Sequence, residues 1–454
     1  MITSSLDTCL DARRIADQPV LITPCRTWGV ADIRAGLKTE LFQLVLQFDH
    51  VAVRLADPLK LSLALIALDG QVKRLFLLPS DVSDAEALDL LGQFDGQALL
   101  TERPLETEAG ITQIMWTEKP APAGAVSRSV KPRAITEWIF ATSGTTGIPK
   151  LVVHTLTSLT RTTKAFSGAP RRWGQMYNIA RFAGIQVFLQ GFLGGLLLLP
   201  DAYSALPDQL DFLTINGCTA LSATPTLWRK ILMTPGHEAL PLSQVTLGGE
   251  IADGAILSAL ALSYPVARVV HIYASTEAGA AFSVSDGQPG FPVSYLQEAP
   301  GGVILKIEDG RLFVRTRDGR SGYLNRNEDF AGEDGFVDTG DRVEIEGDRC
   351  LFLGRENGAI NVGGNKVYPE EVEQILLRHP DIELARVSAR KSPITGQLVV
   401  AEVVARPGAD ATTLPVALKA WCADRLPHWK RPAMIRVVPQ LPATHGGKID
   451  RKTS

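Results

Sequence analysis

The segment ATSGTTGIPKLVVHT, residues 141–155, constrains the fold more than any other part of the sequence. An apolar run, Trp138 to Phe140, leads into a loop of glycines and hydroxyl side chains, and a second apolar run follows Lys150. Glycines permit positive φ angles and let the backbone approach a ligand closely. Two strands joined by such a loop indicate a phosphate site, in which backbone N–H groups, hydroxyls and a lysine surround the oxygens. The residues predicted to form it are Thr142, Ser143, Gly144, Thr145, Thr146, Gly147 and Lys150.

Two other interpretations of this loop fit less well. A flexible Gly/Ser turn would not require hydroxyls, glycines and a lysine to lie together between two strands. The nucleotide-binding pattern GxxxxGK[ST] is also excluded, because here the lysine follows Pro149 and precedes a strand instead of a helix.

The composition is that of a globular chain without a polyanionic partner. The 454 residues are enough for two or three domains, and 45% hydrophobic with 21% charged residues fits a soluble protein. A formal net charge of -3 gives no electrostatic reason to expect nucleic-acid binding. The longest apolar run, VFLQGFLGGLLLLP, is interrupted by glycines and too short to span a membrane, so we expect a buried strand or helix.

The N-terminus and the cysteines predict a cytoplasmic protein. The segment MITSSLDTCLDARR has neither the basic start nor the apolar core of a signal peptide. The five cysteines are scattered, and none belongs to a C-x-x-C pair. This pattern argues against a disulfide framework or a zinc site and is typical of a reducing compartment.

Apolar runs alternate with helical patterns after a proline-rich connector at residues 119–133. EWIFATSG, KLVVHT, GGLLLLP, QVTLGGE and ARVVHIYAS are typical of buried strands, which predicts an α/β fold. From residue 301, Asp-Gly and Gly-Asp turns predict β-hairpins. Beyond residue 356, two helical patterns and two strand patterns follow, which are enough for a compact α+β domain. We therefore predict a large domain at 1–355, with layered sheets and helices and a small β-rich subdomain, and a small domain at 356–454.

The run T-S-G-T-T-G-x-P-K is the signature of the adenylate-forming enzymes, which include acyl- and aryl-CoA synthetases, peptide-synthetase adenylation domains and beetle-type luciferases. The resemblance extends from about Trp138 to Arg451, with the motifs in the family's order. It implies a mobile C-terminal domain that carries a catalytic lysine. LPATHGGKIDR is similar to the family's P-x-T-x-x-G-K-I-x-R, which gives this role to Lys448. The lysine would bind the substrate carboxylate and the α-phosphate oxygens, where a cation offsets developing charge.

The other nucleotide motifs of the family match this sequence residue by residue. VVHIYASTEAG resembles Tyr-x-x-Thr-Glu and implies that Tyr273 precedes a phosphate-binding Thr276 and a Mg²⁺-binding Glu277. Asp341 alone is typical of a turn, but it matches the acid that accepts hydrogen bonds from both ribose hydroxyls. Arg355 matches the arginine that reaches the ribose or phosphate. By the same resemblance, Gly249, Glu250 and Ile251 form one wall of the adenine pocket. Gly363 and Gly364 match the loop that lines the pantetheine tunnel. The hinge position, which is Asp or Lys in relatives, is Asn357 here.

The resemblance places the acid pocket near MYNIARFAGIQVFLQG and ASTEAGAAF. Asn178 and Arg181 fit a surface loop as well as a pocket; facing inward, they would suit a hydroxyl or a second acid group. The compact chain is similar to ligases that load aryl acids onto carrier proteins, so the predicted substrate is a small aromatic acid such as a hydroxybenzoate or hydroxycinnamate. The residues predicted to contact it are Asn178, Ile179, Arg181, Ala274 and Gly279.

The resemblance implies an ATP-dependent, AMP-forming acid–thiol ligase. ATP with Mg²⁺ would convert the carboxylate to an acyl-adenylate, and a pantetheine thiol would then displace AMP. The sequence leaves open whether coenzyme A or the phosphopantetheine of an acyl carrier protein supplies that thiol. The alternatives are a fatty or other aliphatic acyl-CoA synthetase, a luciferase-like oxidation, and a catalytically silent paralogue, against which intact Lys150, Glu277, Asp341 and Lys448 argue.

Overall fold

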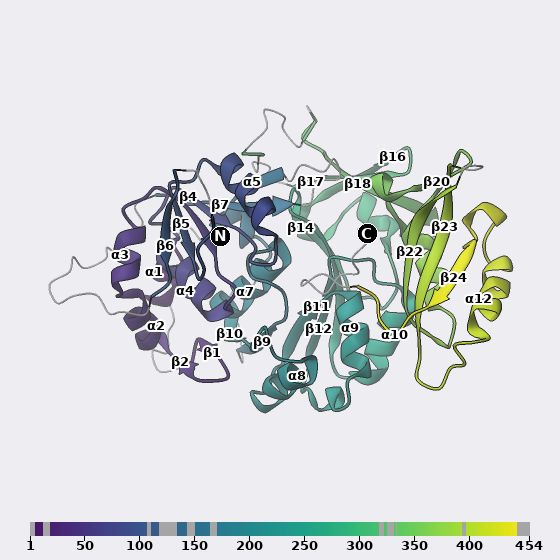
Figure 1. Ribbon diagram of the computed structural model, residues 1–454, viewed down its shortest axis with the longest axis horizontal. Coiled ribbons are helices and arrows are strands. Elements are labelled where there is room, and N and C mark those ends of the chain that lie inside the picture. Colours follow the sequence, from purple (N-terminus) through teal and green to yellow (C-terminus); the bar gives the residue numbers. More distant parts are fainter. Residues whose placement is uncertain are drawn as a thin grey trace.

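Four β-sheets organise the part of the chain that the structure describes (Figure 1). The structure is a computed structural model that describes residues 5–11, 19–106, 110–117, 134–142, 150–163, 170–316, 322–324, 331–332, 334–392 and 396–442. In Figure 1 the N-terminal sheet lies on the purple side, the longest sheet occupies the teal middle, and the C-terminal sheet lies on the yellow side.

The N-terminal sheet has six strands and is parallel except at one edge. Its elements are α1 (Leu6–Asp11), α2 (Val30–Leu37), α3 (Glu40–Val45), β3 (His50–Arg54), α4 (Pro58–Leu68), β4 (Arg74–Leu77), α5 (Asp84–Phe94), β5 (Ala98–Thr101), β6 (Thr112–Met115), β7 (Glu137–Thr142) and β8 (Lys150–Thr155). The strand order is β6-β5-β3-β4-β7-β8, with β8 antiparallel to β7. Helix α4 starts after the N-cap Asp57 and is apolar on all sides, so Leu61 to Leu68 are all buried in the core.

The central sheet has eight strands in the order β14-β13-β12-β11-β9-β10-β1-β2. Its elements are β1 (Leu21–Ile22), β2 (Thr27–Trp28), α6 (Leu156–Leu159), β9 (Arg171–Gln175), α7 (Phe182–Gly194), β10 (Gly195–Leu198), α8 (Leu206–Ile215), β11 (Ala220–Ala223), α9 (Pro225–Met233), η1 (His237–Ala239), β12 (Gln244–Gly248), α10 (Gly254–Ser263), β13 (Arg268–Ser275) and β14 (Gly279–Val284). Side chains of α8, α9 and α10 pack in one cluster with Leu221, Val245 and Leu247 of the strands. Since strand side chains alternate between faces, Ser222, Thr246 and Val270 point to the opposite face.

The third sheet is antiparallel, with five strands in the order β15-β19-β18-β17-β16. Its elements are β15 (Phe291–Pro292), η2 (Val293–Leu296), η3 (Pro300–Gly302), β16 (Ile304–Glu308), β17 (Arg311–Arg315), β18 (Val337–Glu346) and β19 (Arg349–Arg355). The pairs β16–β17 and β18–β19 are the predicted hairpins.

The C-terminal sheet begins just after a short 3-10 turn, η4 (Glu356–Gly358). Its elements are β20 (Ile360–Val362), β21 (Asn365–Val367), α11 (Pro369–Leu377), β22 (Ile382–Ser392), β23 (Gly396–Ala405), α12 (Leu414–Ala423), η5 (His428–Lys430) and β24 (Met434–Val437). The core of this unit lies between the two helices and one face of the sheet, with Val372, Leu376 and Leu418 against Val387 and Val403. The predicted boundary at residue 356 stays a prediction.

The predicted α/β fold class is confirmed, and one local expectation is refined. The run VFLQGFLGGLLLLP is divided between α7 and β10, because the chain turns at Gly195, where a Cβ would lie 2.2 Å from the Arg171 carbonyl oxygen. The strand predicted from ARVVHIYAS is β13, which ends at Ser275, so that Thr276 and Glu277 follow it directly. Within the described residues, no helix combines the length and apolar character needed to cross a membrane.

Candidate active site

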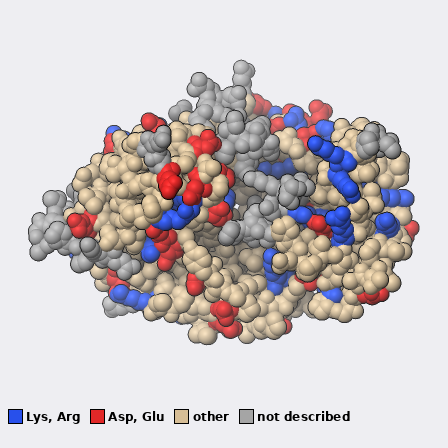
Figure 2. Space-filling model, viewed as in Figure 1, with Lys and Arg blue, Asp and Glu red and all other residues tan. Residues whose placement is uncertain are grey.

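A cavity of about 2040 Å³ lies at the carboxyl ends of the central strands, between the central sheet, the five-stranded sheet and helix α11. Figure 2 shows the molecule hollowed between its two lobes. Loops that leave the carboxyl ends of parallel strands are where α/β folds place ligands. The predicted site residues that line this cavity are Thr142, Asn178, Arg181, Gly249, Glu250, Ile251, Tyr273, Ala274, Thr276, Glu277, Asp341 and Arg355, together with the predicted hinge residue Asn357.

Other predicted site residues do not line the cavity or cannot be placed. Among the described residues, those outside the lining are Lys150, Ile179, Gly279, Gly363 and Gly364. Ile179 is buried, and both Gly363 and Gly364 are exposed in the turn between β20 and β21. Six predicted residues lie outside the described part of the chain: Ser143, Gly144, Thr145, Thr146, Gly147 and Lys448.

A carboxylate at the centre of the site, Asp341, is held by two side chains. The Tyr273 hydroxyl donates to Oδ2 at 2.5 Å, and Arg355 Nε donates to Oδ1 at 3.2 Å. The Tyr273 ring is fixed between Phe282 and Phe352, whose ring centroids lie 5.2 and 5.0 Å away. Each carboxylate oxygen accepts one of these bonds and has lone-pair capacity left, so Asp341 is suited to accept from two ribose hydroxyls.

Charges around Asp341 change the titration of its partners. Burial, reinforced by the Asp341 charge, raises the pKa of Tyr273 well above its ordinary value. Burial alone would lower the pKa of Arg355, but the charges of Asp341 and Glu277 outweigh it, so that pKa is raised. Tyr273 therefore stays a hydrogen-bond donor and Arg355 stays a cation at neutral pH.

The turn that carries Thr276 and Glu277 is anchored by a buried histidine on β8. His154 Nε2 lies 2.7 Å from the Thr276 carbonyl oxygen, and Nδ1 lies 3.1 Å from Ser158 Oγ. Because a carbonyl only accepts, Nε2 must carry the proton, which leaves Nδ1 of the neutral ring unprotonated beside the Ser158 hydroxyl. Burial lowers the pKa of His154 to about 4, so the ring is neutral in this tautomer.

The described residues near Glu277 fit a magnesium ion held mainly by phosphate. Mg²⁺ takes one or two carboxylates, several waters and substrate phosphates in place of an all-protein cage. Glu277 lines the cavity beside Thr276, and in the described part of the chain no group of three His, Cys, Asp or Glu side chains is arranged to hold a metal alone. Mg²⁺ bound here would neutralise polyphosphate charge.

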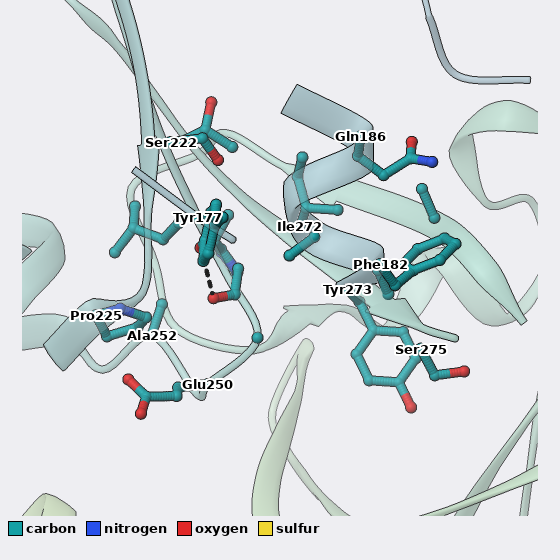
Figure 3. A pocket seen from close by; sticks show the side chains of 18 of the residues that line it. Tyr177, Phe182, Gln186, Ser222, Pro225, Glu250, Ala252, Ile272, Tyr273 and Ser275 are labelled. Atoms are coloured by element: carbon teal, nitrogen blue, oxygen red, sulfur yellow. Dashed lines mark hydrogen bonds between the residues drawn. The ribbon is translucent and has the colours of Figure 1, made fainter. Parts of the chain in front are cut away.

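The wall predicted for adenine is built by the chain after β12. Gly249 has φ +82°, and Glu250 next to it accepts a hydrogen bond from the Thr226 N–H at 3.0 Å. The Tyr177 hydroxyl donates to the Gly248 carbonyl at 3.1 Å, which fixes this turn against β9. Figure 3 shows Glu250 beside Pro225 and Ala252 at one end of the pocket, with Tyr273 and Ser275 at the other.

The predicted acid-binding residues on the segment before α7 are engaged within the protein. Arg181 Nη2 lies 3.0 and 2.9 Å from the two carboxylate oxygens of Asp81, whose side chain is 7% exposed. The Asn178 side-chain oxygen accepts from the Ala180 N–H at 2.9 Å. Direct contact of either side chain with a substrate acid stays a prediction.

Lys150 contacts a neighbouring segment at the edge of the N-terminal sheet. Its Nζ donates to the Tyr323 hydroxyl at 3.2 Å and lies 4.9 Å from the centroid of that ring. The lysine thus has an aromatic partner in this structure, and its contact with phosphate stays a prediction.

Three residues of the site were not found from the sequence. His154 lies inside the quoted run KLVVHT, but its partner Thr276 is 122 positions away. Tyr177 and Asp81 also act through partners distant in sequence, Gly248 and Arg181. In the sequence, each of these residues is recognisable only as a polar residue near an apolar run. That pattern does not indicate which distant residue will be its hydrogen-bond partner.

Comparison with known proteins is consistent with this geometry. The pattern of the AMP-binding enzyme family matches residues 59–324, more than half of the chain, and that of the AMP-binding enzyme C-terminal domain matches residues 371–448. A 2-succinylbenzoate–CoA ligase of Geobacillus kaustophilus is 27% identical over 338 residues, which are 69% of this chain and 68% of that protein.

Two solved structures share the fold over nearly the whole chain. The anthranilate CoA ligase AuaEII in complex with anthranoyl-AMP has a TM-score of 0.79 at 16% sequence identity. The match covers 99% of this chain and 96% of the AuaEII chain. The o-succinylbenzoate coenzyme A synthetase of Bacillus subtilis with ATP and magnesium ion has a TM-score of 0.75 at 21% identity and covers 98% of both. The chain therefore belongs to the AMP-binding enzyme family, whose adenylate-forming members are AMP-forming acid ligases.

Proposed function

We propose that this protein activates a small aromatic carboxylic acid with ATP and transfers the acyl group to a pantetheine thiol. The carboxylate would attack the α-phosphorus of ATP and release pyrophosphate, and the thiol would then displace AMP from the acyl-adenylate. The thiol belongs either to coenzyme A or to the phosphopantetheine of an acyl carrier protein. The named relatives are CoA ligases, which supports coenzyme A as the first acceptor to test.

One observation carries this proposal: a single cavity brings together Glu250, Thr276 with Glu277, and Asp341 with Arg355. A nucleotide needs an adenine wall, a place for phosphates with a cation, and an acceptor pair for ribose. These three groups come from separate parts of the chain, so a structural role for each would not explain their convergence.

An aromatic acid is supported by the side chains at the inner end of the cavity. Tyr177 and Phe182 present rings there, and Ile272 of β13 adds an apolar surface between them (Figure 3). Aromatic and aliphatic walls favour a flat apolar ring over a highly polar acid.

The test is ATP–pyrophosphate exchange with a panel of aromatic and aliphatic acids, followed by thiol capture with coenzyme A and with a holo carrier protein. Exchange with aryl acids and a thioester product is the expected result. Folded protein that exchanges with no acid would contradict the proposal, whereas exchange with aliphatic acids alone would favour the acyl-CoA synthetase alternative. Oxygen consumption without a thiol would favour the luciferase-like reaction.

A further inference from the structure

The cavity does not stop at the inner end of the nucleotide site but continues under helix α7. On β13 the cavity is lined by Arg268 and by every residue from Val270 to Ser275; of these, Arg268, Val270, Ile272 and Ala274 stand at alternate positions and so share one face of the sheet. Gln244, Thr246 and Gly248 of β12 also line the cavity and pair with Arg268, Val270 and Ile272, so they belong to the same face. On the helix, Ala183, Gln186, Gln190 and Gly194 line it at helical spacing, so α7 forms the opposite wall.

This channel is long, and its middle is shielded from water. Ala274 lies six positions after Arg268 on the same strand, which corresponds to about 20 Å at about 3.3 Å per residue. Several lining side chains between those ends are buried: Trp173 is 6%, Ser222 7% and Thr246 2% exposed. A single aromatic ring with its carboxylate would occupy only part of this length.

The far end of the channel is cationic. Arg171 and Arg268 line it and flank Gln244, to which Arg171 Nη1 donates at 2.6 Å, while Arg268 is paired with Gln244 across the strands. Arg268 Nη2 also lies 3.3 Å from the Ser285 hydroxyl. In the described part of the chain, neither arginine has a carboxylate within ion-pair distance.

We propose that the acid substrate carries a second, anionic group that lies between Arg171 and Arg268, at the end of the channel opposite the carboxylate that is activated. This inference rests on the proposed function and specifies its substrate class. Arginine offers several N–H donors in a fixed plane and therefore suits an anionic head group better than a neutral one. The buried middle of the channel would hold the apolar connection between the two polar ends.

The test compares two acids built on the best acid of the exchange panel, both extended to the same length. One ends in a sulfonate, which cannot be activated, and the other in a neutral carboxamide. We expect a kcat/KM in pyrophosphate exchange about tenfold higher for the sulfonate, because two exposed cations contribute about 1 kcal/mol or somewhat more. The preference should fall at high salt, since the arginines are at the surface.

Variants separate a specific contact from a general effect. Arg268→Gln and Arg171→Gln should remove the preference for the sulfonate and leave the carboxamide rate unchanged, and Arg268→Glu should favour an acid that ends in an amine. Arg172→Gln is the matched control, because Arg172 is the next residue on β9, faces the other side of the sheet and donates to the Asn216 carbonyl.

The outcomes of this test are distinct from those of the proposed function. If no acid of the panel supports exchange, the proposed function fails. If unextended acids work but both extended acids are rejected, or if sulfonate and carboxamide react equally well, the inference of a distal anion is wrong while the proposed function stands. Equal losses for both acids in Arg268→Gln would overturn it too.

Discussion

At the scale of single residues, His154 links the phosphate-loop strand to the Thr276–Glu277 turn. Its ring is packed near Phe182 and Phe140, with centroid distances of 5.4 and 5.9 Å, and both of its nitrogens face protein hydrogen-bond partners. A neutral, buried histidine in one tautomer holds the Thr276 carbonyl in place without adding charge next to the predicted phosphate site. Its protonation should therefore destabilise the fold.

The free energy of unfolding should decrease as the pH is lowered, because of His154. The unfolded chain takes up this proton near pH 6.5, whereas the native ring resists it until about 4. The unfolded state then binds more protons, so the free energy of unfolding should fall by about 1.4 kcal/mol for each pH unit below 6.5, down to about 4. Urea unfolding of wild type and His154→Gln at pH 7 and pH 5 measures this difference.

The exposed His428 provides the control for this measurement. His428→Gln should keep the pH dependence of the wild type, because it removes an exposed histidine and leaves the contacts of His154 unchanged. An identical slope in wild type and His154→Gln would show that His154 is not held neutral by the fold.

Asp341 should matter for ATP more than for folding. Asp341→Asn replaces an acceptor that is bonded by Tyr273 and Arg355 with a neutral amide, so one ribose hydroxyl loses its acceptor. Because a hydrogen bond to a charged group contributes about 1.5–3 kcal/mol, kcat/KM for ATP should fall about tenfold to a hundredfold. Steady-state exchange kinetics measure this loss. Asp338→Asn on the same strand, an exposed residue paired with Arg311, should leave the kinetics unchanged; a similar loss in both variants would contradict the role of Asp341.

At the scale of elements, the start of α7 is pressed against the chain before it. A Cβ on Gly184 would lie 1.9 Å from the Asn178 carbonyl oxygen, which is closer than any side chain tolerates. Gly184→Ala should therefore shift α7, which forms one wall of the channel, and destabilise the protein by about 1–3 kcal/mol. Chemical unfolding measures the loss of stability, and the KM of the acid should rise with it.

A second helical glycine gives the opposite expectation. Gly92 lies on the exposed side of α5, and a Cβ there meets nothing within 4 Å. Gly92→Ala should stabilise the protein by about 0.5–1 kcal/mol, because alanine loses less conformational freedom in a helix. Equal effects of the two substitutions would mean that the Asn178 contact does not constrain α7.

Elements with a strong local pattern were predictable, and those that depend on distant partners were not. The predicted strands EWIFAT and RVVHIYAS are nearly continuous apolar runs, and the structure has them as β7 and β13. The strand β22 was not predicted, because Arg386 and Arg390 interrupt its apolar pattern; Arg386 is paired with Glu402 on β23. The site followed the same rule: the motifs named Asp341 and Glu277, but not the length of the channel, which arises from four strands and a helix packed together.

At the scale of the whole molecule, the C-terminal unit is docked on the large one near the predicted hinge. Glu356 lies between Arg342 of β18, at 3.4 Å, and Lys366 of β21. Helix α11 faces the cavity, whereas Gly363 and Gly364 are exposed in the turn between β20 and β21 and stay outside its lining. We expect a rotation near Asn357 to exchange these two surfaces between the half-reactions, as the family resemblance implies.

The division of labour between half-reactions predicts the effect of Lys448→Ala. Lys448 lies outside the described residues, and its role comes from the family motif. Removing the cation should lower the rate of pyrophosphate exchange by at least about a hundredfold, since a group that offsets charge in the transition state contributes about 3 kcal/mol or more. Thioester formation from supplied acyl-adenylate should be largely retained, because that step belongs to the other arrangement of the domains.

Lys419 on α12 is the matched control for this variant. It is an exposed lysine of the same small unit, so Lys419→Ala changes the net charge equally but should leave both half-reactions unchanged. Each half-reaction is measured separately, by exchange of labelled pyrophosphate and by single-turnover consumption of acyl-adenylate with the thiol. If Lys448→Ala slows both steps to the same extent, the lysine serves a single arrangement of the domains, and the two half-reactions do not require the rotation.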